Sequence, residues 1–254
     1  MKKLFCLNST ALKLLAVLFM TIDHIGFYCS NLPMRYIGRL TFPLFAYAIA
    51  EGCRYTKNKK QHFALIFSFG MITQIIYASF AFADSLFNSF LTFSVSVLLI
   101  YLLQYAKECT FAEEKKPFEI LCAWTCLGCA MVAAFVFEDK FEYGFFGMLL
   151  PLFISLCDTR GLTVPKWLSR LDNKWTTLAL AAVGMTLLSY DIATTNEMGN
   201  IQWHCLLALI PLLFYNGKKG KRSLKYFFYL YYPLHLAVLH GIYVLYYYIH
   251  FVWA

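Results

Sequence analysis

The sequence predicts a polytopic all-α membrane protein with about nine transmembrane helices. Hydrophobic residues make up 60% of the 254 residues and charged residues only 14%, with a mean hydropathy of +0.59. A soluble domain typically carries about 25% charged residues. Successive apolar stretches are long enough to cross a ~30 Å hydrocarbon core, and the positive charges fall between them in alternate connections. A single soluble globular domain is excluded.

The expected helices follow one another with short connections. They lie at 11–31, 36–54, 62–83, 88–106, 118–137, 143–157, 175–190, 201–215 and 224–250. Because no soluble segment of useful size remains between them, we expect residues 1–254 to form one membrane domain. The basic start is typical of a signal peptide, but Asp23 and His24 interrupt its apolar run and no cleavage site follows cleanly. We therefore expect a retained first helix.

The distribution of positive charge predicts the orientation of these helices. With nine crossings and a cytoplasmic N-terminus, 19 of the 22 lysines and arginines lie in cytoplasmic segments. The positive-inside rule then places the N-terminus in the cytoplasm and the C-terminus outside, in a bacterial inner or plasma membrane. Topology and contact with anionic lipid account for the net charge of +8. Nucleic-acid binding has little support, because the basic clusters are short and lie between spans.

Two apolar segments carry charged groups where hydrocarbon is expected. Asp23 and His24 lie in the first segment, and Arg39 and Glu51 lie in the second. A charge near the bilayer centre costs at least ~2.5–3.5 kcal/mol, so such side chains usually face the bundle interior or a wet cavity. Adjacent residues on a helix diverge by about 100°, so Asp23 and His24 need different partners.

Arg39, placed in the outer half of the second helix, is the expected partner of Asp23. A buried Arg–Asp pair lowers the cost of both charges, and a purely structural pair that fixes helix register is the alternative. Pro43 lies four residues after Arg39, lacks an N–H, and predicts a kink in the same helix. Glu51 either forms a cytoplasmic ion pair with Arg54 or Lys57 or belongs to the intramembrane site.

The last helix brings a second histidine to mid-membrane depth. His235 follows Pro233 by two residues and lies about ten residues past the cytoplasmic end. Buried His24 and His235 at similar depth fit a general acid/base pair, a pair of axial haem ligands or a proton relay in a transporter. A metal site is weaker, because no His/Asp/Glu pair has i, i+3 or i+4 spacing within one helix.

Polar groups on two other segments are further candidates. Asn88, Thr92 and Ser96 recur at i, i+4 and i+8, which places them on one helix face. Such a stripe either joins helices or lines a substrate channel. Tyr143 stands beside Gly144 at the start of the sixth segment, where it either supports close packing or contacts substrate.

Several of these motifs recur together in one known family. The blocks LKLLAVLFMTIDHIG, RYIGRLTFPLFAYAIAEG, NSFLTFSVSVLLIYLL, YGFFGMLLPLFI and YNGKKGKRSLKYFFYLYYPLHL resemble the TraX family in the same order and over nearly the whole chain. The resemblance implies an integral membrane acetyltransferase or acyltransferase that uses acetyl-CoA. In TraX the acceptor is the N-terminus of a conjugative pilin. Here the acceptor stays open between a protein N-terminus, a glycan and a lipid.

The resemblance also implies roles for the residues singled out above. His24 is the expected general base, and His235 shares that role or protonates the leaving thiolate. Asp23 and Arg39 orient and charge-balance the site, Asn88 and Thr92 donate to the oxyanion or acceptor, and Glu51 and Tyr143 contact substrate. No metal or haem is expected. A transporter or flippase that uses the same charged residues as a relay is the alternative function.

The basic cytoplasmic segments are suited to the phosphates of CoA. The residues assigned to this contact are Lys57, Lys59, Lys60, Asn216, Lys218, Lys219, Lys221 and Arg222. Positive-inside charge alone accounts equally well for these lysines. The chain has no glycine-rich phosphate motif, so the CoA assignment depends on the resemblance together with charge.

Overall fold

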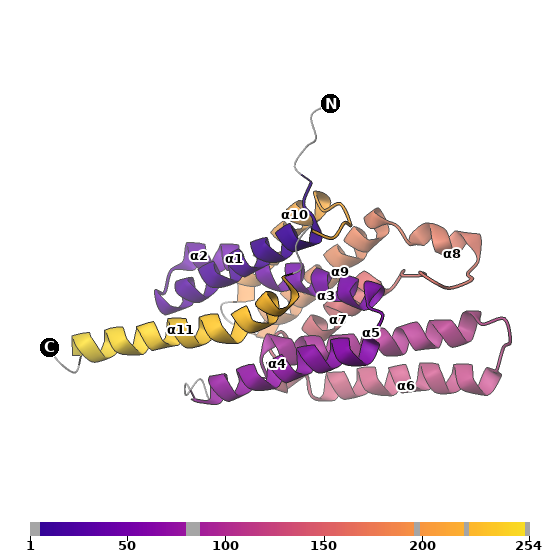
Figure 1. Ribbon diagram of the computed structural model, residues 1–254, viewed down its shortest axis with the longest axis horizontal. Helices are drawn as coiled ribbons and strands as arrows, with labels where there is room; N and C mark the ends of the chain where they lie inside the picture. The colour runs from indigo at the N-terminus through magenta and orange to yellow at the C-terminus, as the bar shows by residue number, and fades with distance from the viewer. Residues whose placement is uncertain (1–5, 80–86, 196–198, 221–223, 252–254) are drawn as a thin grey trace, which may run out of the picture.

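The computed structural model describes residues 6–79, 87–195, 199–220 and 224–251, and these residues form a bundle of helices (Figure 1). Two isolated β-bridges, Leu7 to Tyr215 and Phe87 to Phe141, are the extended pairings in this described part. In chain order the elements are α1 (Ser9–Tyr28), α2 (Leu32–Gly38), α3 (Thr41–Tyr55), α4 (Lys59–Ser79), α5 (Ser89–Phe111), α6 (Pro117–Val136), the 3₁₀ turn η1 (Glu138–Lys140), α7 (Gly144–Ser155), α8 (Lys166–Leu171), α9 (Lys174–Thr195), the 3₁₀ helix η2 (Gly199–Ala208), α10 (Leu209–Leu213) and α11 (Lys225–Phe251).

Six described helices are long and apolar enough to cross a membrane. They are α1, α4, α5, α6, α9 and α11. The other three predicted segments are also helical but shorter. Helix α3 has 15 residues, α7 has 12, and the 3₁₀ helix η2 continues into the five residues of α10. The prediction of an all-helical, multi-pass membrane protein is confirmed.

Helix α5 lies at the centre of the bundle, packed against α3, α4, α6 and α7. The predicted polar stripe joins these neighbours. The Ser96 hydroxyl donates to the carbonyl of Met148 in α7 at 2.7 Å, and the Thr92 hydroxyl donates to the carbonyl of Glu142 at 2.9 Å. Asn88 is the N-cap of α5 and accepts from the Phe90 N–H at 3.0 Å. The stripe therefore holds helices together.

The predicted helix over 36–54 is wrong, because the chain breaks at Arg39 and Leu40 into α2 and α3. Pro43 explains the break. It has no N–H to give to the Arg39 carbonyl, and proline is best tolerated in the first turn of a helix, where α3 places it. Arg39 thus lies in a turn between two helices instead of inside one.

The basic loops gather at one end of the bundle, opposite the C-terminal end of α11 (Figure 1). We call the end that carries residues 56–58, 112–116, 156–173 and 214–220 the basic end. Arg54 at the end of α3 bridges Asp172 at 2.8 Å and Asp158 at 3.5 Å. The Lys174 ammonium donates to the carbonyls of Leu213 and Tyr215 at 2.7 and 2.8 Å. These contacts close the ends of α3, α7, α9 and α10 against one another.

The packing of α9 on α7 gives a stability prediction with a matched control. A Cβ at Gly184 in α9 meets Leu150 Cδ1 at 2.7 Å, whereas a Cβ at Gly128 in α6 meets nothing within 4 Å. Gly184→Leu is expected to lower the free energy of unfolding by about 1–3 kcal/mol through overpacking. Gly128→Leu, the same change on an open helix face, is expected to leave it unchanged. Thermal unfolding in detergent checks both, and equal effects contradict the α7–α9 contact.

Candidate active site

A cavity of about 770 Å³ runs between the helices and is lined by residues from both ends of the bundle. At the basic end its wall includes Lys13, His62 and Phe228, and at the opposite end it includes Glu138, Asp139, Asp191 and Thr195. Asp23, His24, Arg35 and Arg39 lie along the wall between these two ends. The charged groups predicted to avoid lipid therefore face an internal cavity.

Asp23 is held by two arginines from the segment that follows α1. Its carboxylate lies 2.9 Å from an Arg35 nitrogen and 3.5 Å from an Arg39 nitrogen. Two glycines allow the approach, because a Cβ at Gly38 collides with the Asp23 side chain and a Cβ at Gly26 lies 2.6 Å from Met34 Cβ. The predicted Asp23–Arg39 pair is confirmed, although Arg35 is the nearer partner. Because the two guanidinium groups of Arg35 and Arg39 face the single carboxylate of Asp23, this part of the wall carries a net positive charge.

The two predicted histidines meet across the α1–α11 contact. His24 Nδ1 lies 2.8 Å from the Met20 carbonyl and 3.3 Å from His235 Nε2, with the rings edge to face. His235 Nδ1 lies 2.9 Å from the Tyr231 carbonyl. A carbonyl only accepts, so both Nδ1 atoms carry a proton, and His235 Nε2 is placed to accept from the His24 Nδ1–H. His24 Nε2 is the ring nitrogen left for a ligand in the cavity.

His235 contacts the Nδ1 side of His24 and is not among the residues that line the cavity. It is buried and stacked on Tyr231, whose ring lies 5.2 Å away and nearly parallel. The Tyr231 hydroxyl in turn lies 2.7 Å from the Thr21 hydroxyl on α1. This chain of contacts fixes α11 against α1 and sets the orientation of the His24 ring.

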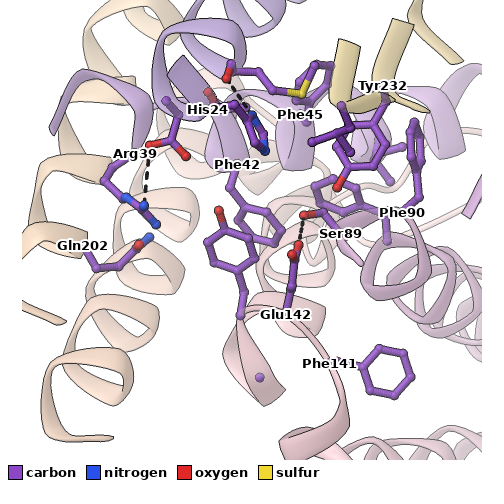
Figure 2. A pocket seen from close by; sticks show the side chains of 18 of the residues that line it. His24, Arg39, Phe42, Phe45, Ser89, Phe90, Phe141, Glu142, Gln202 and Tyr232 are labelled. Carbon is purple, nitrogen blue, oxygen red and sulfur yellow. Dashed lines mark hydrogen bonds and ion pairs between the residues drawn. The ribbon is translucent and has the colours of Figure 1, made fainter. Parts of the chain in front are cut away.

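A second polar group lies on the far side of the cavity from Arg39 (Figure 2). The Ser89 hydroxyl and the Tyr77 hydroxyl, the latter at 3.3 Å, donate to the Glu142 carboxylate. Burial raises the pKa of the Glu142 carboxyl. Between the two polar groups, Phe42 stacks on Tyr143 with ring centroids 3.8 Å apart. Tyr143, at a φ of 65°, lines the cavity, and its predicted contact with substrate stays a prediction.

Several predicted contact residues lie elsewhere. Asn88 and Thr92 are fully buried, engaged in the helix contacts described above, and outside the cavity wall. Glu51 lies in a smaller cavity of about 400 Å³ at the basic end, where the Tyr215 hydroxyl donates to it. It forms no ion pair with Arg54, whose partners are Asp158 and Asp172.

The predicted CoA-binding residues cluster at the basic end but do not line the main cavity. Lys57, Lys60, Asn216, Lys218 and Lys219 are exposed there, and Lys59 pairs with Glu108 at 3.2 Å. Asn216 lines the smaller cavity. Lys221 and Arg222 lie outside the described residues.

Four functional candidates escaped prediction from the sequence: Lys13, Arg35, Ser89 and Glu142. All line the main cavity. Arg35 carried a usable signal, because it lies one helical turn before Arg39 and shares its face. Glu142 and Ser89 carried none, since an acidic residue and a serine near a connection look like ordinary loop and cap residues.

Comparisons with known proteins agree with this architecture. A family model described as "TraX protein" matches residues 8–243. The chain is also similar to the "Probable fimbrial assembly protein FimC, serogroup H1" of Dichelobacter nodosus, with 27% identity over 247 residues that cover 90% of this chain and 92% of the relative. No solved structure matches the chain. The family match includes every residue of the main cavity, and the chain belongs to the TraX family.

Proposed function

We propose that this protein is an integral membrane acyltransferase that moves an acyl group from acyl-CoA, with acetyl-CoA as the first candidate, to an amine or hydroxyl acceptor. One observation carries the proposal. The His24 ring is held through its Nδ1 by the Met20 carbonyl and His235, at the wall of a cavity lined from both ends of the bundle. A base of this kind suits acyl transfer, because the acceptor must lose a proton as it attacks.

The step proceeds at the thioester carbonyl carbon. His24 Nε2 takes the proton from the acceptor amine or hydroxyl as that atom bonds to the carbonyl carbon. The tetrahedral oxyanion collapses, the C–S bond breaks, and the CoA thiolate recovers the proton from the His24 imidazolium. His235 positions the His24 ring through its Nδ1 side, and the positive Asp23–Arg35–Arg39 group favours negative charge on the reacting oxygen.

The two ends of the cavity suit two different substrates. Lys13 and His62 line it at the basic end, near the exposed lysines, and cationic side chains favour the phosphates of CoA. Glu138, Asp139 and Asp191 line it at the other end. We propose that CoA enters at the basic end and that the acceptor enters opposite. Membership of the TraX family and the similarity to a probable fimbrial assembly protein of Dichelobacter nodosus favour a fimbrial or pilus subunit as acceptor.

We also propose nine crossings, with the basic end in the cytoplasm of a bacterial cell and the inner membrane as the location. The gathering of the basic loops at one end supports this orientation. The three shorter elements, α3, α7 and η2–α10, pack against the longer helices and complete the bundle. An odd count leaves the chain termini on opposite sides.

Reporter insertions test the nine-crossing proposal. Alkaline phosphatase, which is active only outside the cytoplasm, is expected to be inactive when inserted at Lys115 and active at Lys140 or at the C-terminus. A fluorescent protein at the same places is expected to give the reverse pattern. A C-terminal reporter that behaves like the reporter at Lys115 contradicts the odd number of crossings.

A substitution at His24 separates binding from chemistry. His24→Gln is expected to lower kcat for CoA release by about 10²–10⁴-fold, the usual contribution of a general acid or base. The assay uses purified protein, acetyl-CoA and a short peptide with a free N-terminal amine as probe. His250→Gln, on the exposed end of α11, is the matched control.

CoA is expected to raise the unfolding temperature of the wild type and of His24→Gln alike. Ligand at about 100 times its Kd stabilises the folded state by about 2.7 kcal/mol. Full turnover in His24→Gln contradicts the assigned base. Folded wild-type protein that gains no stability from CoA or acetyl-CoA contradicts the acyl-CoA proposal itself.

A further inference from the structure

Buried donors without a partner gather on one wall of the main cavity. Among the described residues, the buried side-chain nitrogen and oxygen atoms that lack a hydrogen-bond partner are Arg39 Nε, Thr41 Oγ1, Arg54 Nε and Gln202 Nε2. Arg39, Thr41 and Gln202 all line the main cavity, whereas Arg54 lines the smaller one. Because buried polar groups in folded proteins are nearly always bonded, such a grouping requires an explanation.

Three separate elements bring these donors together. Arg39 belongs to the turn between α2 and α3, Thr41 begins α3, and Gln202 comes from η2, which packs against both helices. Figure 2 shows the Gln202 amide beside the Arg39 guanidinium, on the opposite side of Phe42 from Ser89. Gln202 is only 2% exposed. Tyr36 of α2 stacks on His204 of η2 at 4.5 Å and holds this contact in place.

The chemistry of the three groups points to an acceptor oxygen. Guanidinium and amide N–H groups only donate, and the Thr41 hydroxyl is able to donate. The contact of Arg39 with Asp23 is long, at 3.5 Å, and uses a single Nη atom. Arg39 Nε, which has no partner among the described residues, is therefore available to a ligand. With Arg35 and Arg39 facing one carboxylate, the local charge favours a ligand oxygen that is negative or becomes so.

We propose that Arg39, Thr41 and Gln202 form an oxyanion pocket that binds the carbonyl oxygen of the acyl thioester. This inference rests on the proposed acyltransferase function and names the groups that stabilise its tetrahedral intermediate. As the acceptor attacks, the carbonyl electron pair moves onto this oxygen, and it returns when the C–S bond breaks. Hydrogen bonds from the pocket strengthen as that charge develops.

The position of the pocket relative to the base fits this role. Arg39, Thr41 and Gln202 line the same cavity as His24, so one bound thioester is able to contact both the donors and the proposed base. From the sequence, Asn88 and Thr92 were the expected oxyanion donors. In the structure those two side chains bond the backbone of other segments, whereas Arg39 Nε and the Thr41 hydroxyl have no partner among the described residues.

Two substitutions remove the donors while nearly conserving volume. Gln202→Met and Thr41→Val are each expected to lower kcat for acetyl transfer from acetyl-CoA to the peptide probe by about 10²–10³-fold, with KM little changed. Thr41→Ser, which keeps the hydroxyl, is expected to retain at least tenfold more activity than Thr41→Val. Thr73→Val is the matched control, because this buried hydroxyl lies outside the cavity and donates to the Phe69 carbonyl at 2.7 Å.

Unfolding temperatures separate a chemical role from a structural one. Thr41→Val breaks no hydrogen bond of that side chain within the described protein, so this variant is expected to unfold at the wild-type temperature without ligand. Gln202→Met also removes the contact of the Gln202 side chain with the Cys205 thiol, and Cys205→Ser is its stability control. A lower unfolding temperature of Thr41→Val that accompanies lost activity overturns the pocket, because it reveals a structural partner for this hydroxyl.

The kinetic outcomes distinguish failure of the oxyanion pocket from failure of the proposed acyltransferase function. A normal kcat in both Gln202→Met and Thr41→Val overturns the pocket and does not contradict the function. A raised KM for the peptide at normal kcat also overturns it, since the donors then bind a carboxylate of the acceptor. Wild-type protein that neither binds CoA nor transfers acetyl overturns the function and the pocket together.

Discussion

The buried ion pair between Asp23 and the two arginines of the α2 segment is the contact on which the site depends. Removing one partner from a buried pair typically costs about 3–5 kcal/mol, because the other charge stays in a low-dielectric surrounding. Satisfying Asp23 requires α2 to fold back against α1, and Gly26 and Gly38 provide the space. The same fold-back places Arg39 in a turn beside the cavity.

The contact between His24 and His235 lies on a different face of α1 from the contact between Asp23 and the arginines. Because Asp23 and His24 diverge by about 100°, one helix serves two neighbours, α2 through the carboxylate and α11 through the imidazole. The Met20 and Tyr231 carbonyls each accept from an Nδ1–H and so fix the orientation of both rings. Helix α1 therefore carries the proposed base, contacts both arginines through Asp23 and contributes Lys13 to the opposite part of the cavity.

Much of this site could be predicted from the sequence, because charge in an apolar segment has few low-energy positions. That constraint identified Asp23, His24, Arg39 and His235 without any knowledge of the fold. It failed for neutral or connecting residues. Asn88 and Thr92 were assigned to substrate but bond the backbone of other segments. Gln202 gave no signal, because it lies in an irregular 3₁₀ helix far along the sequence from Arg39 and Thr41. The single helix expected over 36–54 failed because the consequence of Pro43 was underestimated.

A cavity lined from both ends of a membrane bundle would give the proposed acyl transfer a direction, and a measurement of sidedness tests this central proposal most directly. Proteoliposomes would be prepared with the amine-bearing peptide sealed inside, and radiolabelled acetyl-CoA would be added outside. The expected result is acetylated peptide in the lumen, with the released CoA left outside and no label transferred by His24→Gln. If acetylation occurs only when acetyl-CoA and peptide share one compartment, transfer through a cavity open to both ends is contradicted.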